Sequence, residues 1–139
     1  MVFSTKERRR LITDLLRQRL YPYLAALINN DFGFARAIGG TRDHVHILAD
    51  LKTDVSVAGV VRSVKSISSG WVRRSVPRQR SFAWQEGYGA FSVSASAIPA
   101  VKEYVEGQEV RHRGRSFEDE FKALLRKHDV RFDERYLWR

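Results

Sequence analysis

The chain has 139 residues, with 25 lysine and arginine residues against 16 acidic ones and no cysteine. This length fits one domain, residues 1–139, with a core of its own, and the lack of cysteine excludes disulfide scaffolds, thiolate zinc sites and cysteine nucleophiles. The net charge of +9 and the pI near 10.3 favour a polyanionic partner such as nucleic acid. The apolar runs are too short to span a membrane, and no secretory signal follows the first charges. We therefore expect a soluble, cytoplasmic protein with no membrane partner.

The first half of the chain alternates between helical and strand patterns. Apolar residues at steps of three and four predict an amphipathic helix over 8–29, which Pro22 should kink or divide. Two short strands are predicted at 33–38 and 45–51, and Gly39 and Gly40 indicate a hairpin turn between them. A second amphipathic helix is predicted in "VSVAGVVRSVKSISSGWVRRSV" and ends before Pro77.

The second half adds one predicted strand and two predicted helices. The strand lies in "GYGAFSVS", and Pro99 suits the first turn of the helix that follows, with Ser96 as its cap. Ser116 and Asp119 resemble a capping box at the start of the last helix. The hairpin and the absence of a regular strand–helix–strand rhythm indicate the α+β class. We expect a small antiparallel sheet with helices on one face and a functional site on the open face.

Two of the four histidines stand one residue apart in the strand "TRDHVHILADL". Residues two apart in a strand point to the same side, so His44 and His46 share one face while Val45 and Ile47 share the other. The two imidazoles are thus placed to bind one cation on the face away from the helices. A short motif of this kind has a high false-positive rate, so a metal site needs a further ligand.

The rest of the chain offers few candidates for that ligand. His112 and His128 lie in separate charged helical segments without metal-ligand spacing. In "YVEGQ", Tyr104 and Gln108 are four residues apart on a predicted helix and share one face. By themselves these two residues are more readily interpreted as a core aromatic and a solvated amide.

Four linked blocks carry a resemblance to a known family: "DHVHIL", "SVKSISSGW", "FAWQEGYGAFSVS" and "VKEYVEGQEVRHRGRSFEDEF". In this order and spacing they resemble the single-tyrosine HUH transposases of small insertion sequences and the REP-associated tyrosine transposases. The similarity covers nearly the whole chain. It implies a ferredoxin-like or RRM-like antiparallel sheet, with Tyr104 as the nucleophile and His44, His46 and Gln108 as ligands of Mg²⁺ or Mn²⁺.

The resemblance also implies a reaction and partners. Members of this family cleave and rejoin single-stranded DNA that carries hairpin ends, through a 5′-phosphotyrosine intermediate. They act as homodimers, in some of which the tyrosine helix of one subunit completes the site of the other. The family's first strand normally starts before "VFSTKERR", so we expect a short one here. Arg111 replaces a histidine of close relatives, at a position that we take to be peripheral.

Basic and aromatic residues interleave over 62–84, as expected of a surface that follows a phosphate backbone and stacks bases. The sequence therefore predicts DNA contacts from this segment, namely Lys65, Arg73, Arg74 and Arg78.

Three other hypotheses stay open. An RRM-like binding module without catalysis is suggested by "GYGAFSV", although Glu86 and Ala90 depart from that signature. A metal-dependent nuclease that uses water shares the histidines but gives Tyr104 no role. A domesticated REP-associated relative would keep the chemistry while serving a different target.

Overall fold

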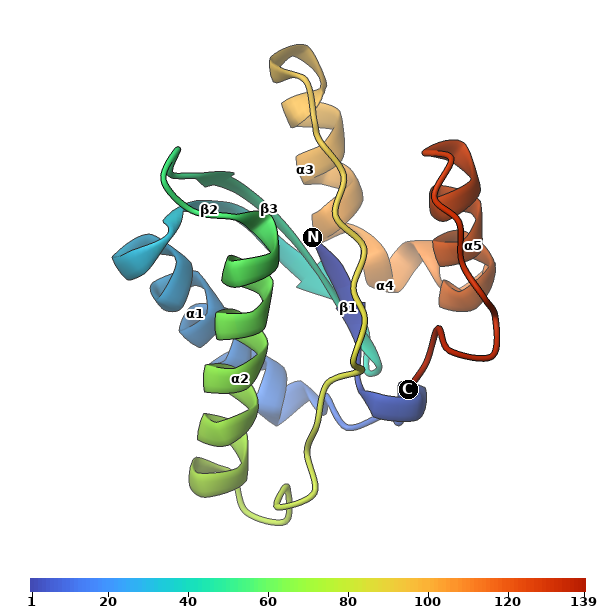
Figure 1. The fold of residues 1–139 in the computed structure, drawn as a ribbon. Helices are drawn as coiled ribbons and strands as arrows, with labels where there is room; N and C mark the ends of the chain where they lie inside the picture. Colours follow the sequence, from blue (N-terminus) through green and yellow to red (C-terminus); the bar gives the residue numbers. More distant parts are fainter.

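Three antiparallel strands form the centre of the molecule in the computed structural model, which describes residues 1–139 (Figure 1). The strands are β1 (Val2–Ser4), β2 (Gly33–Gly40) and β3 (His44–Leu51). Their order is β1-β3-β2, so that β3 pairs on both sides, with Val2 opposite His46 and Gly40 opposite Val45. Strand β1 has only three residues, as expected from the sequence.

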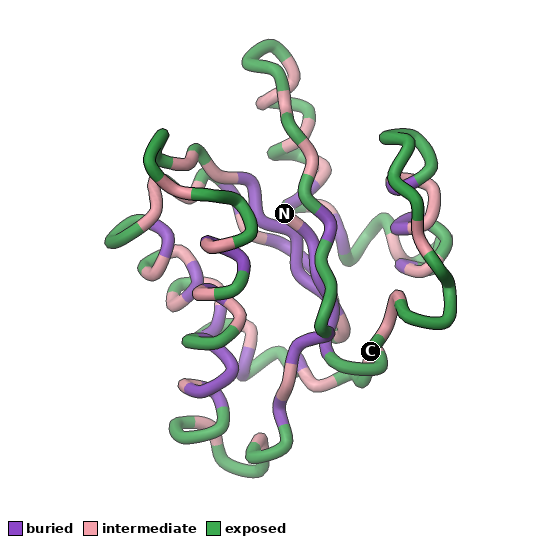
Figure 2. Tube along the Cα trace, viewed as in Figure 1, coloured by how far each residue is buried: buried purple, intermediate pink, exposed green.

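Helices α1 (Asp14–Asp31) and α2 (Val57–Ser75) cover one face of the sheet. Each begins at a hydroxyl cap: Thr13 accepts from the backbone N–H of Leu16, and Ser56 accepts from that of Gly59. The apolar side of both helices packs on Val45 and Ile47, the residues of β3 that point to this face. This is the main core, with 14 buried residues from the helices, the sheet and the segment after α2. Its buried positions in α1 and α2 are among those coloured purple in Figure 2.

The helical periodicity is confirmed, and the helix boundaries differ in part. The first helix starts at Asp14 rather than near residue 8, because Glu7 and Arg8 take positive φ angles of 56° and 52° that a helix cannot contain. Pro22 lies inside α1, which continues through it. The second helix ends before Pro77, as predicted.

The opposite face of the sheet, which we expected to be open, is covered by three short helices. These are α3 (Ile98–Glu106), α4 (Gln108–Arg111) and α5 (Phe117–Lys127). Ala37 and Leu48 point to this face and pack against Val105 of α3, while Phe117 and its neighbours in α5 pack on Val2. The predicted α+β class is confirmed, but apolar residues on both faces of the strands require helices on both sides.

The ends of these helices test two further predictions. Ser116 caps α5, since its hydroxyl accepts from the backbone N–H of Asp119, as the sequence predicts. Pro99 lies in the first turn of α3, but Ser96 does not cap it. Ser96 belongs instead to a single 3₁₀ turn, η2 (Ala95–Ala97), that runs directly into α3.

The strand predicted in "GYGAFSVS" does not form. The segment passes beside β1 and pairs with it through one isolated bridge, at Gly89 with Val2; a second bridge, at Trp84 with Thr5, lies just before the segment and just after β1. The backbones of Val2 and Gly89 exchange two hydrogen bonds of 2.8 Å. A three-residue edge strand offers too few backbone groups to build a longer ladder.

Candidate functional site

His44 lies fully buried at the start of β3, and the residue before it orients its ring. Its Nδ1 is 2.8 Å from Oδ1 of Asp43, which also accepts a 2.9 Å hydrogen bond from the hydroxyl of Thr41. Because a carboxylate only accepts, Nδ1 is the donor in this contact, and Nε2 is turned towards the interior of the site. This is the arrangement in which a histidine is prepared to bind a metal ion.

His46 lies beside His44 on the same face, with the two ring centroids 5.3 Å apart. It is 5% exposed, and its Nε2 has no hydrogen-bond partner. Burial lowers the pKa of His46 well below its ordinary value, and the positive charge that His44 can carry lowers it further. His46 is therefore neutral at pH 7 and offers a free lone pair.

Tyr104 is brought to His46 by α3. The two rings meet edge to face with centroids 5.4 Å apart, and the buried hydroxyl of Tyr104 has no hydrogen-bond partner. Gly39 makes this approach possible, because a Cβ there would stand 1.8 Å from the carbonyl oxygen of Val105. The sequence suggested a turn at Gly39, but this residue belongs to β2 and the connection to β3 lies at 41–43.

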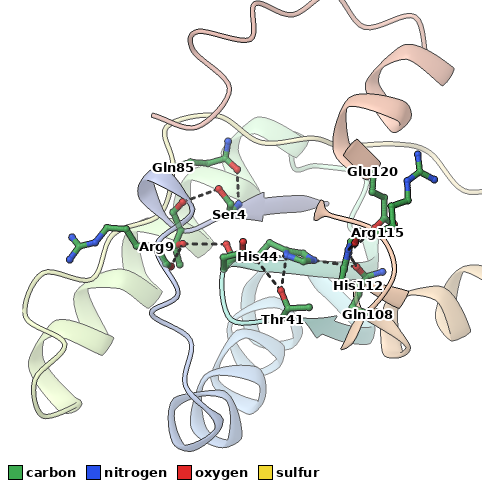
Figure 3. Close-up of polar contacts among 11 residues, drawn as sticks. Ser4, Arg9, Thr41, His44, Gln85, Gln108, His112, Arg115 and Glu120 are labelled. Atoms are coloured by element: carbon green, nitrogen blue, oxygen red, sulfur yellow. Dashed lines mark hydrogen bonds and ion pairs between the residues drawn. The ribbon is translucent and has the colours of Figure 1, made fainter. Parts of the chain in front are cut away.

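Gln108 opens α4 and is fully buried beside His44 (Figure 3). Its side-chain N–H donates a 2.9 Å hydrogen bond to the carbonyl of Tyr104, which directs Oε1 towards the imidazoles. Oε1 lies 3.2 Å from Nε2 of His44. Both atoms can serve as metal ligands, and their separation is close to the roughly 3.0 Å expected between neighbouring ligands of one octahedral Mg²⁺. The donor set therefore fits a divalent cation.

The cation site would depend on these three residues. No group of three or more histidine and carboxylate side chains is arranged to hold a metal ion. The four residues singled out in the sequence, His44, His46, Tyr104 and Gln108, thus converge from β3, α3 and α4 in one chain.

His112 also reaches this site, although its sequence position gave no ligand spacing. Its Nε2 lies 2.9 Å from Oε1 of Gln108 and 2.7 Å from Oε2 of Glu120, while Nδ1 donates to the carbonyl of Arg115 (Figure 3). Burial lowers the pKa of His112 and raises the pKa of Glu120 to about 7. Both shifts favour the uncharged forms, so the contact between His112 and Glu120 is a hydrogen bond from the protonated carboxyl to Nε2 rather than an ion pair.

Two further residues contact the site and were not identified from the sequence. The Phe117 ring stacks on His44, with centroids 3.7 Å apart and planes 4° from parallel. The Arg111 guanidinium lies 4.6 Å above the centre of the Tyr104 ring, so this position is not peripheral. One sequence feature could have indicated Arg111 and His112. They follow Gln108 by three and four residues, which places them on the same face of a helix as Gln108 or next to it.

The four predicted DNA contacts lie away from this cluster, on α2 and just after it, on the other side of the sheet. Lys65 donates to the carbonyls of Glu86 and Gly87, and Arg73 donates to the carbonyl of Phe82. Burial lowers the pKa of Lys65 to about 8. Arg74 and Arg78 are exposed. Contact of these residues with DNA stays a prediction.

Comparisons with known proteins show the fold and the family of the chain. The crystal structure of a candidate transposase from Deinococcus radiodurans R1 is similar in fold, with a TM-score of 0.61 and 20% sequence identity over 77% of this chain and 86% of that one. No curated protein matches the sequence. None of the helices is both long and apolar enough to span a membrane. The family described as "Transposase IS200 like" matches residues 1–108, which is most of the chain. The chain belongs to the IS200-like transposase family.

Proposed function

We propose that this transposase cleaves and rejoins single-stranded DNA through a covalent bond to Tyr104, with a divalent cation held by His44, His46 and Gln108. One observation carries the proposal. A tyrosine hydroxyl and an imidazole nitrogen, both buried and both without partners, lie beside an amide oxygen in a chain of a DNA-transposing family. Leaving such groups unpaired costs about 1–3 kcal/mol each, which a purely structural role does not explain.

The reaction needs only groups of this chain, the DNA strand and the cation. Tyr104 Oη attacks the scissile phosphorus, the new O–P bond replaces the bond to the 3′ oxygen, and the phenolic proton ends on the released 3′-hydroxyl. The cation, Mg²⁺ or Mn²⁺, would withdraw charge from the phosphate and stabilise the charge that develops. Two neutral imidazoles and an amide leave its charge undiminished. Attack of another 3′-hydroxyl on the phosphotyrosine rejoins the strand.

Both reactive atoms are covered in this structure, since the hydroxyl of Tyr104 and Nε2 of His46 are inaccessible to solvent. We propose that α4 and α5 shift to admit the strand. We also propose hairpin DNA ends as targets and a homodimer as the active form. Mixing a His46→Leu chain with a Tyr104→Phe chain tests the exchange of tyrosine helices, because activity of the mixture requires a site shared between subunits.

An RRM-like module without catalysis is less well supported. RRM domains stack bases on an open sheet, whereas helices α3 to α5 cover this sheet face. A water-using nuclease would leave the buried hydroxyl of Tyr104 without a purpose. A domesticated REP-associated relative would share the chemistry, and the DNA flanking its gene distinguishes it from a mobile element.

The decisive experiment is a covalent-adduct assay. Purified protein is incubated with Mg²⁺ or Mn²⁺ and end-labelled single strands from the flanks of its gene, and the adduct is resolved by denaturing electrophoresis. Tyr104→Phe should abolish the adduct. Since the removed hydroxyl is buried without a hydrogen-bond partner, the variant should unfold at the same temperature as the natural chain or at a higher one. An adduct of undiminished yield from this folded variant would exclude Tyr104 as the nucleophile.

A further inference from the structure

A groove of about 440 Å³ opens beside the site, and its lining is rich in arginine. The arginines come from three separate segments: Arg8 and Arg10 precede α1, Arg42 lies in the β2–β3 connection, and Arg113 and Arg115 lie between α4 and α5. Asp43 and Glu109 are the acidic residues of the lining. Arginines gathered from distant parts of the sequence thus face one space.

The charge of this groove is only partly balanced by the protein. Arg8 contacts Glu118 at 2.9 Å and Arg42 contacts Asp14 at 3.8 Å, while Glu109 pairs with Arg17 outside the groove. Arg10, Arg113 and Arg115 form no salt bridge and are exposed. Three guanidinium groups therefore face the groove without a protein anion, and each can take a phosphate in a bidentate manner.

The backbone that carries Arg8 and Arg10 is strained and held in place. Glu7 and Arg8 both take left-handed φ angles, which cost roughly 1–2 kcal/mol for each non-glycine residue. The hydroxyl of Thr5 donates to the carbonyl of Arg9 at 2.5 Å, and the N–H of Glu7 donates to the carbonyl of Trp138 at 2.8 Å. Strain that is kept by surrounding contacts is found where a fixed geometry serves a function.

The groove adjoins the reactive cluster through three of its own lining residues. Asp43 bonds His44, His112 contacts Gln108, and Phe117 stacks on His44. A phosphate in the groove would thus be separated from the candidate metal ligands by a single layer of side chains.

We propose that this groove binds the phosphodiester backbone of single-stranded DNA next to the scissile phosphate. The inference rests on the proposed function for the identity of the ligand. It places the strand on the α4–α5 side of the sheet, not along α2, where the sequence predicted the contacts. Unpaired guanidinium groups from separate segments around one groove suit a polyanion that crosses the groove and meets several of them at once.

The test uses the full chain with Tyr104→Phe as background, so that binding is measured without cleavage. The probe is a fluorescein-labelled oligo(dT) strand of about 16 nucleotides, the upper end of a typical single-strand site. Arg10→Glu with Arg113→Glu is compared with Lys127→Glu and Arg131→Glu, which change the net charge equally at exposed positions outside the groove lining. Arg10→Gln with Arg113→Gln serves as a milder pair, and thermal melting verifies the fold of each variant.

The groove variants should bind at least about 10-fold more weakly than the control pair, and the slope of log K against log salt should fall by about 1.4 for two lost phosphate contacts. If the groove pair and the control pair lose affinity for the strand equally, the groove is not the binding site. That result would leave the proposed function intact if the natural chain still forms the adduct. If no chain forms an adduct but the groove variants lose binding, the groove stands and the proposed chemistry fails.

Discussion

The two sides of strand β3 differ in what they bury. On one side, Val45 and Ile47 pack against α1 and α2 in an apolar core of 14 buried residues. On the other, His44 and His46 are equally buried, among Tyr104, Gln108 and His112. Residues one position apart in the chain therefore enter two environments of opposite character.

The apolar side stabilises the fold, because each fully buried aliphatic side chain contributes about 1.5–3 kcal/mol. The histidine side includes an imidazole nitrogen and a hydroxyl that no protein group satisfies, which lowers stability. The difference supports the proposal that the second face binds a ligand. Substitutions on the two sides should accordingly separate stability from activity.

The largest effect on activity is expected from His46→Leu. Leucine fills a similar volume but offers no lone pair to a cation, so adduct formation should fall by at least about 10³-fold, equivalent to roughly 4 kcal/mol. Stability should change by less than about 1.5 kcal/mol, because the lost nitrogen has no hydrogen-bond partner. Adduct yield and urea unfolding measure the two quantities. A variant that cleaves normally with Mg²⁺ would remove His46 from the ligand set.

Ile47→Ala, the next residue, should show the reverse pattern. Ile47 is 3% exposed in the main core, and truncation to alanine should lower the free energy of unfolding by about 2–5 kcal/mol. Under conditions where the variant stays folded, its adduct yield should match that of the natural chain. Selective loss of activity without loss of stability would contradict the division between the two sides of β3.

A smaller and pH-dependent effect is expected from Glu120→Gln. Burial raises the pKa of Glu120 to about 7 in the folded chain, above its ordinary value. The unfolded chain therefore releases this proton first, and the free energy of unfolding falls as the pH rises between the two pKa values. Glutamine removes this loss, so the variant should be more stable by about 1–2 kcal/mol at about pH 8, with little gain at about pH 4.

Thermal unfolding of Glu120→Gln at both pH values checks this prediction. Glu118→Gln is a suitable control, because the contacts of Glu118 with Lys122 and Arg8 lower the pKa of this carboxyl rather than raise it. The control should lose a little stability at high pH, where the natural carboxylate is charged. A gain from Glu120→Gln that is the same at acidic and alkaline pH would show that burial does not hold the carboxyl neutral.

Local sequence patterns determined much of this protein. The alternation in β3 decided which face His44 and His46 occupy, helical spacing located α1 and α2, and a capping motif located the start of α5, because these features depend on residues close in the chain. The resemblance added Tyr104 and Gln108. The family is confirmed by the match over residues 1–108.

The tertiary structure decided what depends on contacts between distant segments. It covered the second sheet face with α3 to α5, placed His112, Arg111 and Phe117 at the site, and gathered five arginines into one groove. It also left "GYGAFSVS" without a full partner, because β1 is short. No periodic pattern in the sequence predicts these features. Each depends on which surfaces remain exposed, and must be buried, after α1 and α2 have packed on the sheet.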